Sequence, residues 1–189
     1  MSNQLKAVPE PTVYPRTTGK DGQLIATPKN DWTEGFYPGC LWYIYEHNRE
    51  ESWKQSAVKW TEALEPMKKL TSHHDIGFLI YCSFGNGYRL TGKEEYKDVI
   101  IEAANSLTTR FSEVTGCIKS WNYRKAWNGK DEWFYPVIID NMMNLELLLW
   151  ASKNSEHSDF ASIARSHADI TMKNHFRPDY SSYHVVDYH

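Results

Sequence analysis

Segments with helical periodicity follow one another along residues 38–176, and they alternate between two kinds. Three of them repeat apolar residues at three- and four-residue spacing, which is typical of amphipathic helices: residues 51–70, 94–111 and 158–176. The segments that precede these are apolar almost throughout, as expected for buried helices: residues 38–46, 76–90 and 137–151. No alternating strand pattern competes with them. The sequence therefore predicts an all-α fold of helical hairpins, each with one buried and one amphipathic helix.

An array of helical hairpins can close into a ring, with the buried helices inside and the amphipathic ones outside. The three predicted hairpins would form half of such a ring, and no closing helix is predicted over residues 181–189. Residues 1–30 contain four prolines and two glycines, which indicates an extended N-terminal arm. We therefore expect an arm over residues 1–30 and half of a helical ring over residues 31–189.

Two of the buried helices are expected to begin with a carboxylate, Asp75 in one and Asp140 in the other. A charge in an apolar segment is costly to bury unless it is capped, paired or used. Both residues could simply cap their helices. Alternatively, they could converge in one pocket and divide acid and base work between them. The apolar residues around Asp140 are expected to raise its pKa.

Polar and aromatic side chains near these carboxylates are further candidates for a site. Asn141 and Asn144 could hold Asp140 or a ligand by hydrogen bonds, and His73 and His74 could line a polar rim. The two histidines are not expected to bind a metal, because adjacent side chains diverge and no third ligand stands at metal spacing. The remaining candidates are Trp32 and Trp121, as stacking platforms for a sugar, and His184. The same tryptophans could instead fill a core, and a histidine in a loop is often only solvated.

Composition and charge exclude several classes of function. The net charge is -3 and no basic stripe is visible, so no nucleic-acid partner is expected. No apolar stretch reaches membrane-spanning length, so no membrane partner is expected either. The three cysteines lack CxxC spacing, which indicates neither a disulfide framework nor a zinc site. No signal peptide opens the chain, which favours the cytoplasm, although a trimmed leader of a periplasmic protein would leave the same start.

Five motifs in order resemble the unsaturated glucuronyl hydrolases, glycoside hydrolase family 88. The resemblance runs from about residue 31 to the end, through residues 31–36, 74–78, 89–92, 139–145 and 181–184. It implies a six-hairpin α/α barrel, or α/α toroid, of which this chain would be about the N-terminal half. It also implies oligosaccharide substrates left by polysaccharide lyases, which carry a C4=C5 double bond in the terminal uronic acid.

The resemblance implies hydration of that vinyl ether, with no attack on the anomeric carbon. Asp140 would be the general acid and base, and Asp75 the essential second carboxylate. The substrate-binding residues implied by the motifs are Trp32, His74, Trp121, Asn141 and His184. No metal and no organic cofactor are implied, in line with the lack of a ligand cluster or a glycine-rich phosphate loop.

Other interpretations of the sequence remain open. A related unsaturated rhamnogalacturonyl hydrolase would perform similar chemistry on pectin fragments, although residues 141–144 and 181–184 favour the glucuronyl enzymes. A non-catalytic sugar-binding module would use the aromatic residues as a platform and both aspartates as caps. A helical scaffold for protein partners would expose an apolar patch, which the charged outer faces of the amphipathic helices do not indicate.

Overall fold

The computed structural model describes residues 2–156 and 159–188, which form two compact units. Unit 1 contains the described residues up to Lys68 together with Phe78–Ile100. Unit 2 contains Lys69–Gly77 and the described residues from Ile101 onward.

Unit 1 is built around a helical hairpin. α2 (Phe36–Asn48) packs against α3 (Glu51–Glu62), and Arg49 turns the chain between them with a positive φ of 59°. α4 (Asn86–Thr91) packs on both helices, and a π-helix, η2 (Gly77–Gly85), leads into it. The core of the unit holds two tryptophans, and Trp42 donates a hydrogen bond to Thr61 Oγ1 at 2.9 Å.

The first 30 residues, predicted as an extended arm, contain regular structure. α1 (Ser2–Ala7) is followed by an antiparallel hairpin of β1 (Tyr14–Thr18) and β2 (Leu24–Thr27). Tyr14 is fully buried and donates a hydrogen bond to Trp60 O at 3.1 Å. The anchor on Trp60 makes this segment part of unit 1, an attachment that proline and glycine content alone does not indicate.

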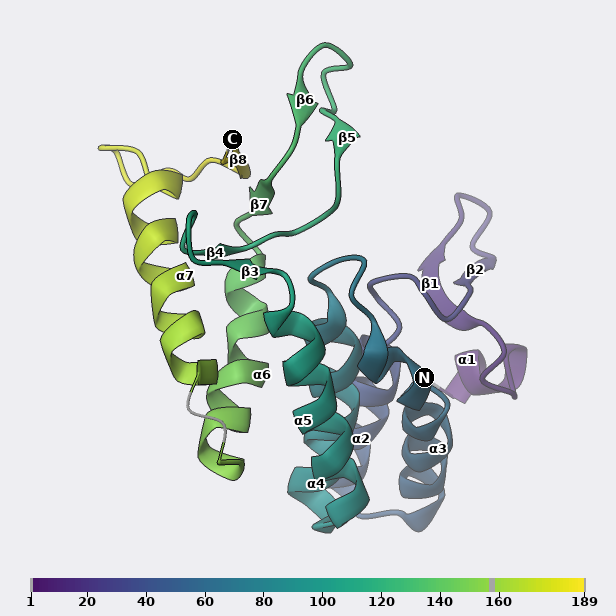
Figure 1. The fold of residues 1–189 in the computed structure, drawn as a ribbon. Helices are drawn as coiled ribbons and strands as arrows, with labels where there is room; N and C mark the ends of the chain where they lie inside the picture. The colour runs from purple at the N-terminus through teal and green to yellow at the C-terminus, as the bar shows by residue number, and fades with distance from the viewer. Residues whose placement is uncertain (1, 157–158, 189) are drawn as a thin grey trace. The chain divides into compact units, whose positions relative to one another are not determined.

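Unit 2 is built around a second helical hairpin. α6 (Asn141–Asn154) packs against α7 (Asp159–His175), and the two lie side by side in Figure 1. α5 (Glu94–Thr108) begins in unit 1 and ends in unit 2. Short strands stand at one end of the α6–α7 pair (Figure 1): β3 (Phe111–Ser112) pairs with β4 (Cys117–Ile118), β5 (Arg124–Lys125) with β6 (Glu132–Trp133), and β7 (Pro136–Ile138) with β8 (Val185–Asp187).

The predicted helices are found, with changed boundaries. Residues 51–70 divide into α3 and a 3₁₀ helix, η1 (Glu65–Lys69). Residues 137–151, predicted as one helix, divide into β7 and α6. Pro136 restricts the residue before it to extended backbone, and the β-branched Val137 and Ile138 suit a strand. The apolar run was therefore wrongly assigned to a single helix.

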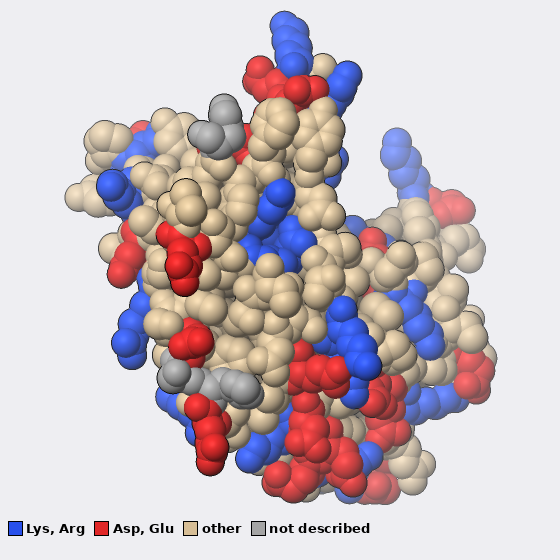
Figure 2. Space-filling model, viewed as in Figure 1, with Lys and Arg blue, Asp and Glu red and all other residues tan. Residues whose placement is uncertain are grey.

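The surface carries charges of both signs. On the face shown in Figure 2, Lys and Arg side chains are interspersed with Asp and Glu side chains and with uncharged surface. Among the described residues, no helix is both long and apolar enough to cross a membrane. The same residues contain no group of three or more His, Cys, Asp or Glu side chains that could hold a metal ion.

Candidate active site

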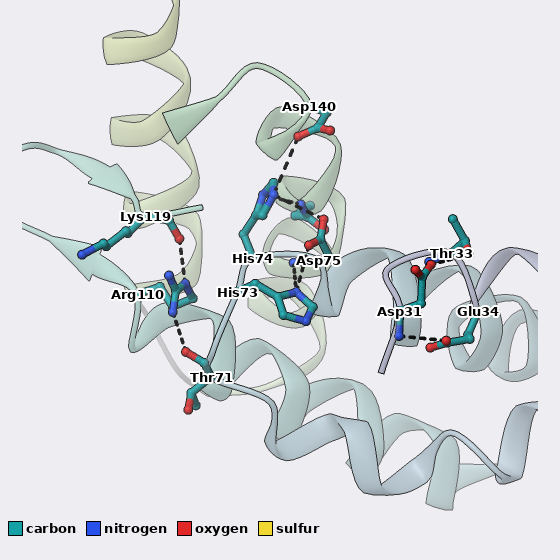
Figure 3. A network of polar contacts seen from close by, with 11 residues as sticks. Asp31, Thr33, Glu34, Thr71, His73, His74, Asp75, Arg110, Lys119 and Asp140 are labelled. Carbon is teal, nitrogen blue, oxygen red and sulfur yellow. Dashed lines mark hydrogen bonds and ion pairs between the residues drawn. The ribbon is translucent and has the colours of Figure 1, made fainter. Parts of the chain in front are cut away.

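The segment that carries His73, His74 and Asp75 is held by backbone contacts within unit 2. Arg110 donates from Nη1 to Thr71 O at 2.5 Å and from Nε to Lys119 O at 2.7 Å (Figure 3). The His74 amide donates to Ser120 O at 3.0 Å. Arg110 therefore joins the segment at Thr71 to the segment after β4.

Ser120 connects the His74 segment to the strand that precedes α6. Its carbonyl accepts from His74, its amide donates to Pro136 O at 2.8 Å, and its hydroxyl accepts from the Ile138 amide at 3.0 Å. The residue is fully buried. All three groups are hydrogen-bonded, so one serine sets the position of two distant segments.

The imidazole of His74 lies between the two carboxylates predicted to form the site. Its Nε2 stands 3.3 Å from Asp75 Oδ1 and 3.8 Å from Asp140 Oδ1 (Figure 3), and the residue is 1% exposed. On the other side of the ring, Asn144 Nδ2 lies 3.2 Å from Nδ1. An amide NH₂ can only donate, so Nδ1 accepts and the ring proton sits on Nε2, facing the carboxylates. Burial lowers the pKa of His74, which favours this neutral form.

Asp75 is buried and has a second histidine partner. His73 Nδ1 lies 2.8 Å from Asp75 Oδ2 (Figure 3). The two oxygens of Asp75 therefore face two different imidazoles. The alternative in which Asp75 merely caps a helix does not account for these contacts.

A glycine lets the two carboxylate segments approach each other. Gly77 begins η2, and a Cβ at this position would collide with Asn144 Oδ1 and lie 2.9 Å from Asn144 Cα. Asp75 precedes Gly77 by two residues, and Asp140 precedes Asn144 by one helical turn. The close contact between Gly77 and Asn144 thus brings the two aspartates to the same nitrogen of His74.

Asp140 occupies the N-cap position of α6 without capping it. Its side chain makes no hydrogen bond to a helix amide among the described residues. The side chain is 38% exposed although Oδ1 is buried, so its exposure lies at Oδ2 and the methylene. Among the described residues, no group is placed to hydrogen-bond Oδ1. The capping interpretation therefore fails for Asp140.

The surroundings of Asp140 raise its pKa. Burial is the largest cause, and the nearby charge of Asp75 acts in the same direction. His74 and His184 act in the opposite direction. A carboxyl of this kind holds its proton at a higher pH than an exposed aspartate, which is what a general acid requires.

Strand pairing brings His184 to the site. β7 and β8 are antiparallel with Ile138 opposite Val185, and the Ile139 amide donates to His184 O at 2.9 Å. His184 is thereby placed beside the residue that precedes Asp140. Residues 184 and 140 are far apart in sequence, and the ladder between them is only three residues long on each strand.

A cluster of three tryptophans adjoins His74 and His184. Trp121 stacks on Trp133 with ring centroids 6.1 Å apart, and Trp127 meets Trp133 edge-on at 5.1 Å. Trp121 also contacts His74 edge-on at 6.1 Å, and Trp127 lies 5.5 Å from His184. The cluster therefore forms an aromatic wall beside the carboxylates.

Six of the seven predicted site residues belong to unit 2: His74, Asp75, Trp121, Asp140, Asn141 and His184. Two of the six have side chains that are almost fully buried. His74 is buried between carboxylates, and Asn141 is fully buried with Nδ2 donating to Ile118 O at 2.7 Å. Both side chains therefore contact other buried groups of the site and are not on the surface of an open pocket.

Trp32, the seventh residue, belongs to unit 1. Its ring contacts Phe36 edge-on at 6.0 Å and Phe78 at 6.2 Å, and the guanidinium of Arg16 stands 5.1 Å from the ring centre. Arg16 also pairs with Asp31 at 3.2 Å. The Trp32 ring thus lies against two phenylalanines and a guanidinium from the N-terminal hairpin, and its role as a platform for a sugar stays a prediction.

Sequence reasoning missed Ser120, Trp127 and Trp133. The two tryptophans had a signal, since they follow Trp121 at regular six-residue spacing and flank Asn128-Gly129, a dipeptide typical of hairpin turns. Ser120 had no signal in the sequence, because its role depends on the His74 segment and the strand before α6, which meet only in the folded chain.

No protein-family model matches the chain. An unsaturated glucuronyl hydrolase of Formosa agariphila is 44% identical over 177 residues, which are 93% of this chain and 43% of that protein. A solved structure of an unsaturated glucuronyl hydrolase specific for heparin is 41% identical, with a TM-score of 0.91 over 100% of this chain and 48% of its own. The chain belongs to the unsaturated glucuronyl hydrolase family. An unsaturated chondroitin disaccharide hydrolase of Streptococcus pneumoniae is 34% identical over 175 residues, 91% of this chain and 43% of that protein.

As a member of the unsaturated glucuronyl hydrolases, the chain has their all-α fold, the α/α toroid, and makes up about half of it. It spans less than half the length of the curated relatives that it matches. The resemblance to glycoside hydrolase family 88 agrees with these relatives.

Proposed function

We propose that the whole protein is a glycoside hydrolase that releases a terminal 4,5-unsaturated glucuronic acid from glycosaminoglycan oligosaccharides. The observation that carries this proposal is the state of Asp140. One of its oxygens is buried against His74, the exposure of its side chain lies at the other, and its pKa is raised. The names of the relatives support the substrate class.

In the proposed reaction, Asp140 donates its proton to C4 of the double bond. The positive charge that develops at C5 is shared with the ring oxygen. Asp140, now a carboxylate, takes a proton from water as the water oxygen bonds to C5. The resulting hemiketal opens, the ring collapses, and the bond to the next sugar breaks. One carboxyl thus serves as acid and then as base.

Asp75 and His74 are assigned supporting roles. Asp75 and Asp140 both approach His74 Nε2, and the charge of Asp75 raises the pKa of Asp140. Asp75 also offers an acceptor for substrate hydroxyls. His74, with its proton on Nε2, faces both carboxylates, and its burial favours this role over direct contact with substrate. His184 and Trp121 are proposed to hold the unsaturated ring.

The test follows the ultraviolet absorbance of the C4=C5 double bond conjugated with its carboxylate. The protein, in the full length that its gene encodes, is expected to remove this absorbance from an unsaturated chondroitin disaccharide. Asp140→Asn should lower the rate by at least about 100-fold, the usual contribution of a general acid. Asp169→Asn on the exposed face of α7 is the matched control, and it should keep full activity.

Two outcomes would overturn the proposal. If the absorbance stays constant with every unsaturated glucuronyl disaccharide tested, the hydrolase function fails. If Asp140→Asn is as active as Asp169→Asn, the acid is wrongly assigned. Faster turnover of an unsaturated rhamnogalacturonan disaccharide would instead favour the rhamnogalacturonyl alternative.

A further inference from the structure

The β5–β6 hairpin carries Trp127, whose ring has several aromatic neighbours but stays exposed. Trp127 is 56% exposed, although a side chain of this size is usually largely buried. In Figure 1 the hairpin extends away from the α6–α7 pair of its own unit. An isolated two-stranded hairpin is marginally stable, so its shape must be fixed by side chains.

The turn beside Trp127 is fixed by hydrogen bonds. The Ala126 amide donates to Asp131 O at 2.8 Å, and the Gly129 amide donates to Ala126 O at 2.9 Å. Asn128 Oδ1 accepts from the Lys130 and Asp131 amides at 3.0 and 3.1 Å. Gly129 has a φ of 70°, which suits a glycine. The backbone that carries Trp127 is therefore ordered in advance of any ligand.

The ring of Trp127 is oriented by its neighbours. It stands edge-on to Trp133, with centroids 5.1 Å apart, and at 63° to Trp121, with centroids 5.9 Å apart. The guanidinium of Arg124 lies 5.5 Å from the Trp121 ring centre. Arg124 is exposed, so its positive charge lies next to the aromatic wall. This combination suits an anionic sugar, which offers apolar ring faces to tryptophan and a carboxylate or sulfate to a cation.

The wall is continuous with the candidate active site. Trp127 contacts His184, with ring centroids 5.5 Å apart. The charge of His184 acts on Asp140, and its carbonyl is bonded to the residue before Asp140. Trp127 therefore contacts His184, and His184 lies next to the residue before Asp140.

We propose that Trp127 is the platform for the second sugar ring, to which the unsaturated uronic acid is linked, with Arg124 as the cation beside it. The proposal rests on the proposed function. It predicts that Trp127 determines preference among second sugars and takes no part in the hydration of the first.

Two substrates separate these roles in the absorbance assay. One is an unsaturated chondroitin disaccharide, and the other is the methyl glycoside of the same unsaturated uronic acid, which lacks the second ring. For Trp127→Ala, the ratio of kcat/KM for the disaccharide to kcat/KM for the methyl glycoside should fall about 10-fold, as expected for the loss of one aromatic stacking contact. Trp127→Phe keeps an aromatic face and should restore most of the ratio.

Tyr123→Ala is the matched control. Tyr123 is an exposed aromatic of the same hairpin, but its ring contacts Phe134 and its hydroxyl donates to Glu132. The variant should leave the ratio of the two kcat/KM values unchanged. A shift as large as that of Trp127→Ala would show that the hairpin as a whole, and not the Trp127 ring, sets the ratio.

An equal loss with both substrates in Trp127→Ala would overturn the inference, because Trp127 would then act by positioning His184. No loss with either substrate would overturn it as well. Failure of the proposed function is a different result, in which the unsubstituted protein turns over neither compound.

Discussion

An aspartate at the N-cap position of a helix usually accepts hydrogen bonds from the helix amides, which lowers its pKa. Asp140 has this position in α6 but turns its Oδ1 toward His74. The carboxylate therefore gains no hydrogen bonds from the helix amides, while burial still disfavours its charged form. The pKa of Asp140 is raised for this reason, with the charge of Asp75 adding to the effect.

Asp75→Asn should therefore lower the pKa of Asp140. The substitution removes a negative charge that favours the protonated acid, so the alkaline limb of the activity profile should move to lower pH. Titration of the Asp140 carboxyl by ¹³C NMR measures the shift directly. Asp169→Asn serves as the control, and an Asp140 pKa that rises in Asp75→Asn would contradict the assignment.

Asn144 is predicted to fix the tautomer of His74. Asn144→Ala removes the only donor that the described residues present to Nδ1, at 3.2 Å. We expect about 1–3 kcal/mol lower free energy of unfolding, because a buried acceptor is left unpaired. ¹⁵N NMR of His74 should change from protonation at Nε2 to a mixture of tautomers. Asn154→Ala, near the other end of α6, should leave the His74 spectrum unchanged.

At the scale of elements, the site depends on a close approach between Gly77 and α6. Gly77 and Asn144 meet at a distance that leaves no room for a Cβ, and the obstructing atoms include the Asn144 backbone. A helix with a small residue at such a contact can bring neighbouring side chains together that would otherwise stand apart. The carboxylates flank His74 because of this contact.

Gly77→Ala should therefore separate the two segments. We expect a free energy of unfolding about 1–3 kcal/mol lower, as for other overpacked positions, together with a large loss of kcat. Urea unfolding and the absorbance assay measure the two effects. Gly92→Ala is the comparison, since a Cβ there meets nothing within 4 Å and its φ of 66° alone costs about 1–2 kcal/mol. Unchanged kcat in Gly77→Ala would exclude the role of this contact.

At the scale of the whole molecule, buried histidines make stability depend on pH. His167 on α7 is fully buried, its Nδ1 accepts from the Ile118 amide at 3.0 Å, and burial lowers its pKa to about 4. The unfolded chain binds the proton near pH 6.5. Stability from this group is thus complete above about pH 6.5 and is lost as the pH falls toward 4.

Acid should therefore destabilise the protein through His167. Between pH 7 and pH 4 its contribution to the free energy of unfolding should fall by roughly 3 kcal/mol. Burial lowers the pKa of His74 and His175 as well, so the total loss is larger. Urea unfolding at several pH values should show a smaller acid loss in His167→Gln than in His47→Gln, where the histidine is exposed. Equal losses in both variants would contradict this account.

The sequence by itself determined the helices, the family and the two carboxylates. Apolar periodicity reports which face of a segment is buried, so α5 and α7 lie within three residues of their predicted bounds. α3 begins at its predicted residue but ends at Glu62, before the 3₁₀ helix η1. Periodicity does not report which distant segments meet. Strands of two or three residues are too short to show an alternating pattern. The pairing of β7 with β8, which brings His184 to Asp140, therefore had no signal in the sequence.

Only the tertiary structure decided how the polar groups are used. His74 became the bridge between Asp75 and Asp140 because Ser120, Gly77 and Asn144 hold its segment against α6. Whether an aspartate caps a helix or faces an imidazole depends on atoms from several segments packed within a few ångströms. That information exists in the folded chain, where burial and hydrogen-bond geometry set each pKa, and not in the order of residues along any one segment.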